Sequence, residues 1–311
     1  MGLDVVDTDP LHVSSCFVPL CLCHFVPEVK LSCIETMNMP LSSGVDIYFT
    51  VIALLWGACI GSFANVCIYR IPRGISVVTP RSRCPHCEQT IAWYDNIPLC
   101  SFFILGMKCR HCGRRIAPRY FLVEFLTAIV FLLIWLKFGF DALTPIYWLM
   151  AVGLIIGTFI DFEFMILPDR LTVGGMIAGP ILSLLVPSMQ GQMTAYAGFC
   201  ASVSGLAIGT VFLWLVAMFG TLVFRKEAMG MGDVKLLGAL GAFLGWKAVL
   251  FIVMGASLAG AVVGVSLVIA RHKTMASKIP FGPYIALAAI VWILWGQGWG
   301  TAYMAWLAQG L

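Results

Sequence analysis

Long runs of apolar residues, broken only by short polar segments, fill most of the chain after residue 46. A helix needs about 20 such residues to cross a bilayer core of about 30 Å. The pattern therefore predicts an all-α polytopic membrane protein with about eight transmembrane helices, although the sixth run is short for a crossing. The predicted spans are residues 47–69, 120–138, 143–162, 171–187, 195–220, 233–246, 248–270 and 280–296.

The composition of the chain supports this interpretation and excludes a water-soluble globule. Of 311 residues, 60% are hydrophobic and only 11% are charged, and the mean hydropathy is +0.96. These values are typical of a membrane protein with several spans and one modest soluble segment. We expect a first transmembrane helix over residues 46–69, a soluble segment over 70–119 and a transmembrane core over 120–311.

Residues 1–45 differ from the rest of the chain. They contain four scattered cysteines and several prolines, with Lys30 as the only Lys or Arg. A secretory signal would have a basic start, an apolar core and a small-residue cleavage site, and these features are not present in that order. We expect a disordered extension, or a start codon assigned too early, with Met37 or Met39 as the natural start.

The distribution of basic residues predicts the orientation, because Lys and Arg collect on the cytoplasmic side of a membrane. If segment 70–119 faces the cytoplasm and the spans alternate, 16 of the 19 Lys and Arg residues lie on that side. Lys137 and Lys247 fall on the other side, and Lys30 lies in the N-terminal extension. The pattern predicts a multi-pass membrane protein with segment 70–119 on the cytoplasmic side.

Two aspartates stand at the membrane boundary, where holding a charge is costly and an acid is a functional-site hypothesis by default. Asp161 ends the third predicted span, and Asp233 begins the sixth within Gly-Met-Gly-Asp at 230–233. The glycines of this motif permit backbone bending and close approach. The predicted topology puts both carboxylates at the cytoplasmic face, so we expect the other spans to act as a scaffold that brings them together.

Two carboxylates in a partly dry site cannot both ionise at low cost, so they share a proton. The ionised group can then take a proton from water while its neighbour donates one to a peptide carbonyl, as in aspartic proteases. Each aspartate alone could instead cap a helix or pair with Lys235 or Arg170. Their common depth, together with the glycine motif, favours catalysis by Asp161 and Asp233.

Two further acids compete for this role. Asp169 follows Pro168 and precedes Arg170, a position suited to a loop or to the cap of the fourth span. Glu163 lies beside the same loop without distinguishing context, and is the weaker alternative.

Segment 70–119 carries two Cys-x-x-Cys pairs separated by 21 residues. This spacing is typical of a tetrahedral four-thiolate zinc site. Disulfides are disfavoured because we expect this segment in the reducing cytoplasm. Since four protein ligands leave no open position, the zinc would be structural. The predicted ligands are Cys84, Cys87, Cys109 and Cys112, with His86 and His111 as bystanders.

Small and polar residues inside the predicted spans have two interpretations. Gly57, Gly61 and Ser62 suit close helix packing. Asn65 and Glu124 are polar groups that need partners inside a membrane. Packing hydrogen bonds and contacts to a bound ligand both account for these two side chains.

These residues resemble those of the bifunctional prepilin leader peptidase/N-methyltransferases of type IV pilus and type II secretion systems. The resemblance covers nearly all of residues 47–296, and Phe121 departs from it because the family usually has proline there. It rests on Gly61–Arg70, the paired Cys-x-x-Cys with Trp93–Pro98 between, Arg119–Glu124, Asp161–Asp169 and Gly230–Asp233.

The resemblance implies an aspartic protease of the bacterial inner membrane, with Asp161 and Asp233 as its catalytic pair, that cuts prepilins and pseudopilins at the cytoplasmic face. It also implies methylation of the new N-terminal residue by S-adenosylmethionine. No glycine-rich cofactor fingerprint is visible, so the residues that would bind this methyl donor stay unassigned. Asn65, Glu124 and the cysteine segment are the places to look.

Three other functions fit the sequence less well. A cleavage-only preflagellin-type peptidase generally lacks the cysteine segment. A transporter would more often show repeat symmetry and broken helices near the midplane. A nucleic-acid binder would use the basic segment, but Trp93 and Tyr94 lie beside Asp95 and Pro98, which suits a packed loop better than a stacking platform. We therefore expect no nucleic-acid partner.

Overall fold

The computed structural model describes residues 44–79, 81–225, 229–270, 280–296 and 298. The prediction for residues 1–45 falls almost entirely outside these residues. Residues Met37–Gly296 form one compact unit, and the description below concerns that unit.

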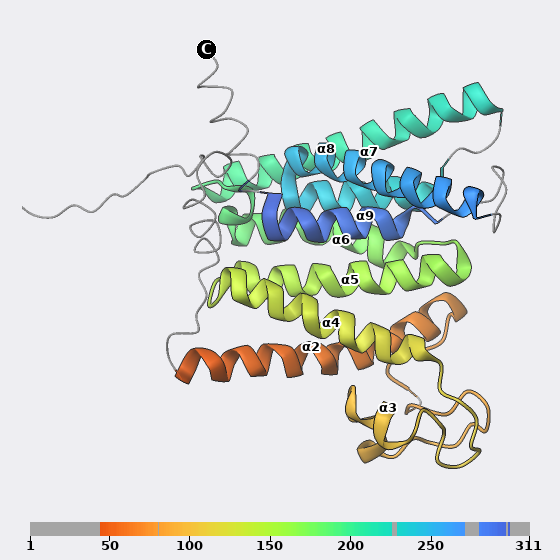
Figure 1. The fold of residues 1–311 in the computed structure, drawn as a ribbon. Helices are drawn as coiled ribbons and strands as arrows, with labels where there is room; N and C mark the ends of the chain where they lie inside the picture. The colour runs from red at the N-terminus through yellow and green to blue at the C-terminus, as the bar shows by residue number, and fades with distance from the viewer. Residues whose placement is uncertain (1–43, 80, 226–228, 271–279, 297, 299–311) are drawn as a thin grey trace, which may run out of the picture. The chain divides into compact units, whose positions relative to one another are not determined.

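The described chain is built from helices, as predicted. Most are long and apolar, and two isolated β-bridges accompany them in the segment between the first two. The principal helices are α2 (Gly44–Arg70), α4 (Pro118–Phe138), α5 (Leu143–Phe164), α6 (Asp169–Leu185), α7 (Ala195–Phe224), α8 (Met231–Ile269) and α9 (Gly282–Val291), followed by the π-helical turn η4 (Trp292–Gly296) (Figure 1).

The helices correspond to the eight predicted spans when the two halves of α8 are counted separately. In the described part of the chain, α2, α4, α5, α7 and α8 have the length and apolar composition of a membrane span. The remaining two predicted spans are the 17-residue helix α6 and the shorter α9 with η4.

Helix α8 reverses direction at Gly245, which has φ 79° and ψ 172°. In a straight helix, residues 241 and 249 would be about 12 Å apart along the axis. Here a Cβ added to Gly241 would lie 3.0 Å from Val249 Cγ2, so the chain folds back. The predicted boundary between spans 233–246 and 248–270 coincides with this bend.

The bend at Gly245 frees a backbone carbonyl that must be paired inside a membrane. Ala242 O accepts hydrogen bonds from Gln190 Nε2 at 2.7 Å and from Ser202 Oγ at 2.6 Å. Gln190 ends the short turn η3 (Pro187–Gln190) and Ser202 lies on α7. These two side chains therefore stabilise the reversal of α8.

Glycines bring neighbouring helices into close contact, as predicted for α2. A Cβ added to Gly57 would lie 2.8 Å from Ala128 Cα, and one added to Gly61 would lie 2.7 Å from Glu124 Cα. The same device joins α6 to α8, where a Cβ at Gly175 would lie 3.0 Å from Ala239 Cβ. Small residues at helix interfaces permit this approach in membranes.

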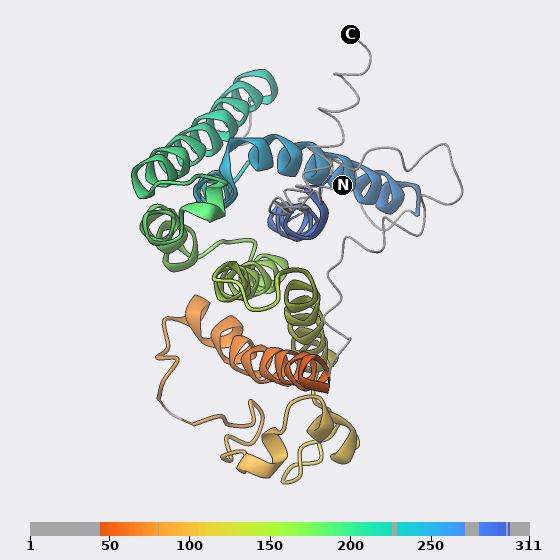
Figure 2. The same cartoon turned by 90° about the vertical axis from the view of Figure 1, so that its left-hand side faces the viewer.

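Helix α5 occupies the middle of the unit and contacts α2 and α4 on one side and α6 and α9 on the other. Figure 2, which views the helices nearly end-on, shows this order, with α7 and α8 beyond α6 and α9. One buried apolar cluster joins α4 and α5 to α7, α8 and α9, and a second joins α2, α4 and α5.

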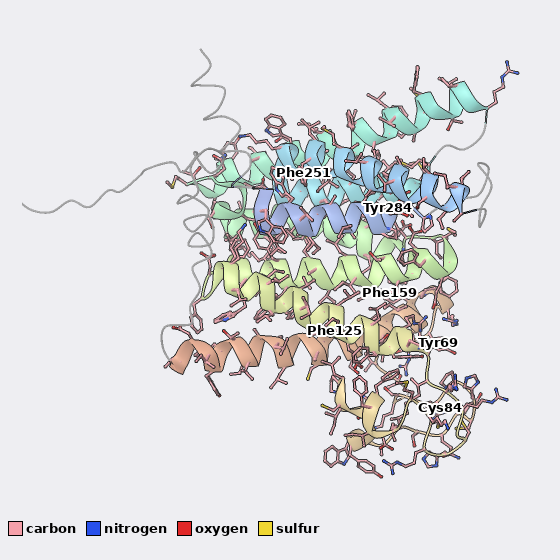
Figure 3. All side chains as sticks on the ribbon, viewed as in Figure 1. Tyr69, Cys84, Phe125, Phe159, Phe251 and Tyr284 are labelled. Atoms are coloured by element: carbon pink, nitrogen blue, oxygen red, sulfur yellow. The ribbon has the colours of Figure 1, made fainter. Side chains whose placement is uncertain are left out.

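One end of the helix bundle collects polar contacts between helices. Asn65 Nδ2 of α2 donates a hydrogen bond to Tyr120 O at the start of α4 (2.9 Å). Arg119 of α4 forms an ion pair with Glu163 at the end of α5. In Figure 3, Tyr69 near the end of α2 and Cys84 lie toward this same end. This is the end that the distribution of Lys and Arg assigns to the cytoplasm.

Lys137 is one of the two exceptions to that distribution and lies at the opposite end of α4, where its position has a structural reason. Its Nζ donates hydrogen bonds to Ile293 O at 2.7 Å and Leu294 O at 2.8 Å. Both carbonyls belong to η4, where the wider π-helical turn leaves them without their usual partners. The basic side chain therefore serves a structural role there.

Segment 70–119 contains short turns around its cysteines: η1 (Ile71–Arg73), η2 (Trp93–Asn96) and α3 (Cys100–Ile104). The buried guanidinium of Arg70 donates from Nη1 to Ser76 O at 3.0 Å and from Nη2 to Arg81 O at 3.4 Å. The end of α2 thereby holds the first loop of the segment.

The contact at Gly61 predicts the effect of enlarging this residue. In Gly61→Val, the new side chain would push α4 away from α2 and strain the Asn65–Tyr120 hydrogen bond, so overpacking should destabilise the protein by about 1–3 kcal/mol. Thermal unfolding in detergent measures this loss. Gly153→Val on α5 is the matched control, because a Cβ there meets nothing within 4 Å. Equal loss in both variants would contradict close packing at Gly61.

Candidate active site

Asp161 lies in the last turn of α5 and is buried, with 6% of its surface exposed. A carboxylate there is disfavoured by the negative end of its own helix. A partner comes from another helix: Gly282 N–H, at the start of α9, donates to Asp161 Oδ2 at 3.1 Å. The N-terminus of α9 thus offsets the unfavourable position of Asp161.

Asp233 is the third residue of α8, which begins after Gly230. The carboxylate therefore lies in the first turn, where the positive end of the helix favours an acid. Gly232 permits a close contact, because an added Cβ would lie 2.9 Å from Leu167 Cβ. Neither glycine of the motif has positive φ, so close approach, and not the expected free bending, accounts for Gly232.

The two aspartates line one cavity. Its volume is about 250 Å³ and it opens where the ends of α5, α6 and α8 meet. The α5–α6 loop, held against α8 by the Leu167–Gly232 contact, supplies most of the remaining wall. The lining residues are Asp161, Met165, Ile166, Leu167, Asp169, Gly230, Met231, Gly232 and Asp233.

Among the described residues, neither aspartate forms the alternative ion pair with Lys235 or Arg170. Lys235 Nζ pairs with Asp169 Oδ1 at 2.6 Å, which connects α8 to the first residue of α6. Glu163 pairs with Arg119. Both competing acids are therefore engaged by cations, although Asp169 also borders the cavity.

Asn65 and Glu124 have packing partners. Besides the bond from Asn65 to Tyr120 O, Glu124 Oε2 accepts a hydrogen bond from Leu99 N–H at 2.8 Å. Asn65 Oδ1 is buried and has no partner within the described part of the chain. The packing interpretation accounts for Asn65 Nδ2 and Glu124 Oε2 and leaves the Asn65 carbonyl oxygen unexplained.

The four predicted metal ligands come together between two tight turns. The Sγ atoms of Cys84, Cys87, Cys109 and Cys112 all lie within 4.8 Å of one another, and Cys84 Sγ is 3.9 Å from Cys112 Sγ. A tetrahedral ion with bonds of about 2.3 Å to sulfur would separate its ligands by about 3.8 Å. The cluster can therefore hold a metal ion, and the described cysteines form no disulfide.

The thiols of the cluster differ in acidity. Backbone hydrogen bonds from Cys112 and His111 lower the pKa of Cys109 to about 6. Cys87 also receives a backbone hydrogen bond, from Gln89, which lowers its pKa, but burial and the other three thiols raise that pKa to about 11. The Cys109 thiolate therefore forms readily while Cys87 resists ionisation, and a bound cation would remove that resistance.

An ion pair stiffens the same segment. Arg110 donates to both carboxylate oxygens of Asp95, at 2.8 and 2.6 Å. These hydrogen bonds lower the pKa of Asp95 and raise the pKa of Arg110. The pair ties η2 to the second cysteine turn.

Comparison with protein families matches both the cysteine cluster and the pair of aspartates to known domains. Residues 55–138, which include all four cysteines, match the bacterial peptidase A24 N-terminal domain. Residues 148–265, which include Asp161 and Asp233, match the type IV leader peptidase family. The chain belongs to the type IV leader peptidase family.

Several relatives have the same two-part name. A prepilin leader peptidase/N-methyltransferase of Myxococcus xanthus is 41% identical over 72% of this chain and 65% of its own length, just under two thirds. Proteins of that name from Aeromonas salmonicida and Pseudomonas aeruginosa are 33% and 34% identical, over 99% and 93% of their lengths and 87% and 82% of this chain. No solved structure matches the chain.

Sequence reasoning missed Gly282. A Cβ at this position would lie 2.8 Å from Asp161 Oδ2, so only glycine allows the observed hydrogen bond. The signal available was Gly-Pro at the start of an apolar run, which is a common helix start. Nothing local in that pattern indicates that a residue 121 positions before it is the partner.

The four-cysteine cluster predicts binding of one divalent metal ion per chain. Purified protein should contain that ion by elemental analysis, and Cys84→Ser/Cys112→Ser should lose it because two of the four ligands are removed. Cys59→Ser/Cys200→Ser is the matched control, since both residues are exposed thiols outside the cluster. Metal retained after the first double substitution would contradict the assignment.

Proposed function

We propose that this chain is a membrane aspartic endopeptidase that removes the leader of type IV prepilins and pseudopilins and then methylates the new N-terminal amine. The names of its relatives support both activities. The observation that carries the peptidase activity is that Asp161 and Asp233, 72 positions apart, line one cavity.

The cavity supports hydrolysis by two carboxyl groups. The ionised aspartate takes a proton from water as the water oxygen attacks the scissile carbonyl carbon, and the protonated aspartate donates its proton to the carbonyl oxygen. As the resulting diol collapses and its C–N bond breaks, the aspartate that took the proton from water gives it to the leaving amine, and the other aspartate takes back a hydroxyl proton of the diol. The cavity volume of about 250 Å³ is enough for a short stretch of peptide rather than a folded substrate.

Gly282 acts as a positioning residue in this mechanism. Its N–H holds Asp161 Oδ2, so the reaction can use Oδ1 without rotation of the carboxylate. Holding a reacting group in place lowers the entropic part of the barrier. Lys235 and Asp169 play a similar part for the cavity wall, because their ion pair connects α8 to α6 beside the α5–α6 loop.

The metal in the four-cysteine cluster is zinc in a structural role. Four thiolates would complete its tetrahedral shell, so no open position would remain for substrate or water. Cys84, Cys87, Cys109 and Cys112 would join the two turns of segment 70–119, whose two isolated bridges alone are a weak framework.

The methyl donor is S-adenosylmethionine, which supplies an electrophilic methyl group to an amine. A new α-amine has an ordinary pKa of about 7.7–8.0, so a useful fraction is neutral and nucleophilic near neutral pH. This activity rests on the names of the relatives, and no residue of this chain is assigned to the donor.

The protein resides in the bacterial inner membrane with the cavity facing the cytoplasm. Support comes from the 16 Lys and Arg residues that the alternating topology assigns to one side. The helix ends that border the cavity, those of α5, α6 and α8, belong to that side.

The proposed dyad predicts the effect of removing either carboxylate. Asp161→Asn and Asp233→Asn should each lower the rate of leader cleavage by about 10²–10⁴-fold, because acid–base catalysis is lost while shape is kept. Purified enzyme, a prepilin and S-adenosylmethionine are mixed, and mass spectrometry of the pilin N-terminus measures cleavage and methylation together. Methylation of a pre-cut pilin should persist in both variants if the two sites are separate.

Asp141→Asn is the control for this experiment. Asp141 caps Leu143 N–H at the start of α5, the end opposite Asp161, and asparagine can make the same bond. Its cleavage rate should match that of the unmodified enzyme. Wild-type cleavage by either dyad variant, with loss of cleavage in Asp169→Asn, would transfer the catalytic role to Asp169.

The contact at Gly282 generates a separate prediction. In Gly282→Ala, the methyl group displaces Asp161 Oδ2, and a shift of about 1 Å in a reacting group can cost about 100-fold in rate. We expect kcat to fall while KM changes little. Gly260→Ala on α8 is the control, since its Cβ would meet Tyr284 at an ordinary 3.6 Å. A larger change in KM than in kcat would contradict a positioning role.

A further inference from the structure

Segment 70–119 carries an apolar surface that its cysteine cluster does not explain. In α3, the side chains of Phe103 and Ile104 are 60% and 72% exposed, and Met107 just after it is 46% exposed. A short helix with neighbouring exposed apolar side chains is unusual on a water-facing loop, because such patches generally mark an interaction surface.

Ring contacts place α3 alongside the membrane helix α4. The rings of Phe102 and Phe103 lie 5.3 and 5.2 Å from the ring of Phe121, and Phe121 in turn lies 5.9 Å from Phe125. Figure 1 shows α3 beside α2 and α4, and not beyond their ends.

The length of α4 fixes the depth of these contacts. Its 21 residues measure about 31 Å, which only just covers a hydrocarbon core of about 30 Å. Phe121 is then about 4.5 Å and Phe125 about 10.5 Å from the first residue of the helix. The rings of α3 therefore lie at the level where the hydrocarbon begins.

Backbone polar groups around α3 are paired within the protein, as that depth requires. Leu99, which has φ 62°, donates its N–H to Glu124 Oε2 of α4 at 2.8 Å. Ser101 Oγ accepts from Ile97 N–H at 2.9 Å and donates to Tyr94 O at 3.3 Å. Glu124 thus pairs a backbone N–H that water would pair if the turn faced the cytoplasm.

The apolar surface continues onto the outer face of α4. Leu122, Phe125 and Leu126 are 45%, 45% and 38% exposed, and in a membrane span such side chains contact lipid. Lys108, four residues after the last residue of α3, is exposed, and a basic side chain near a membrane surface is attracted to anionic headgroups.

We propose that α3 is an interfacial anchor, with Phe103 and Ile104 inserted among the acyl chains beside α4 and Lys108 at the anionic headgroups. The occupant of this surface is the bilayer leaflet that surrounds the cytoplasmic ends of α2 and α4. The anchor holds the four-cysteine cluster against the membrane surface. It does not depend on the proposed catalytic activity.

Photocrosslinking in lipid tests this anchor. p-Benzoylphenylalanine replaces Ile104 in the full chain, which is reconstituted in nanodiscs of phosphatidylethanolamine and phosphatidylglycerol and irradiated. Mass spectrometry then counts lipid adducts. The same residue at Leu126 on α4 is the positive control, and at Gln89, exposed in the first cysteine turn, the negative control.

The expected result is a lipid-adduct yield at position 104 that approaches that at position 126 and exceeds that at position 89 several-fold. A yield at position 104 as low as that at position 89 would overturn the proposal. Crosslinks from position 104 to protein, with no lipid adduct, would also overturn it, because the surface would then bind another chain. p-Benzoylphenylalanine at Phe103 repeats the test. This exchange replaces one aromatic ring by another and so preserves the ring contacts with α4.

Discussion

A polar group at membrane depth must find its partner within the protein, because lipid offers no hydrogen bonds. Three irregular features of the described chain satisfy that requirement with a group from a distant segment. The bend of α8 at Gly245 is paired by Gln190 and Ser202, and the wide turn η4 by Lys137. The carboxylate of Asp161 is paired in the same way, by a backbone N–H of α9. The contacts that stabilise the helices also build the cavity.

Close packing makes those partners reachable. Glycines on α2, α6 and α8 allow backbones to approach to distances at which even a methyl group would clash. Gly232 and Gly282 extend this principle to the cavity, where one admits Leu167 and the other admits the Asp161 carboxylate. Small residues therefore have one physical role in both the scaffold and the site, because each lets two segments approach more closely than a larger side chain would permit.

The cysteine segment is joined to the membrane helices by specific bonds rather than by its covalent ends alone. Arg70 at the end of α2 holds its first loop, and Glu124 of α4 holds the turn before α3. The ion pair of Arg110 with Asp95 connects its two halves. A metal in the cluster would complete a rigid body attached to α2 and α4, the helices that precede the peptidase half of the chain.

The sequence alone determined the all-helical class, the limits of the spans to within a few residues and the two Cys-x-x-Cys turns, because apolar runs and short spacings are local properties of the chain. It also indicated Asp161 and Asp233, since an acid at a membrane boundary is unusual wherever the chain goes next. Only the tertiary structure decided which groups meet: Gly282 with Asp161, Lys235 with Asp169 instead of Asp233, Glu124 with Leu99, and α3 with the side of α4. The three residue pairs among these join positions from 25 to 121 apart, and helix packing, which no local pattern encodes, sets their distances.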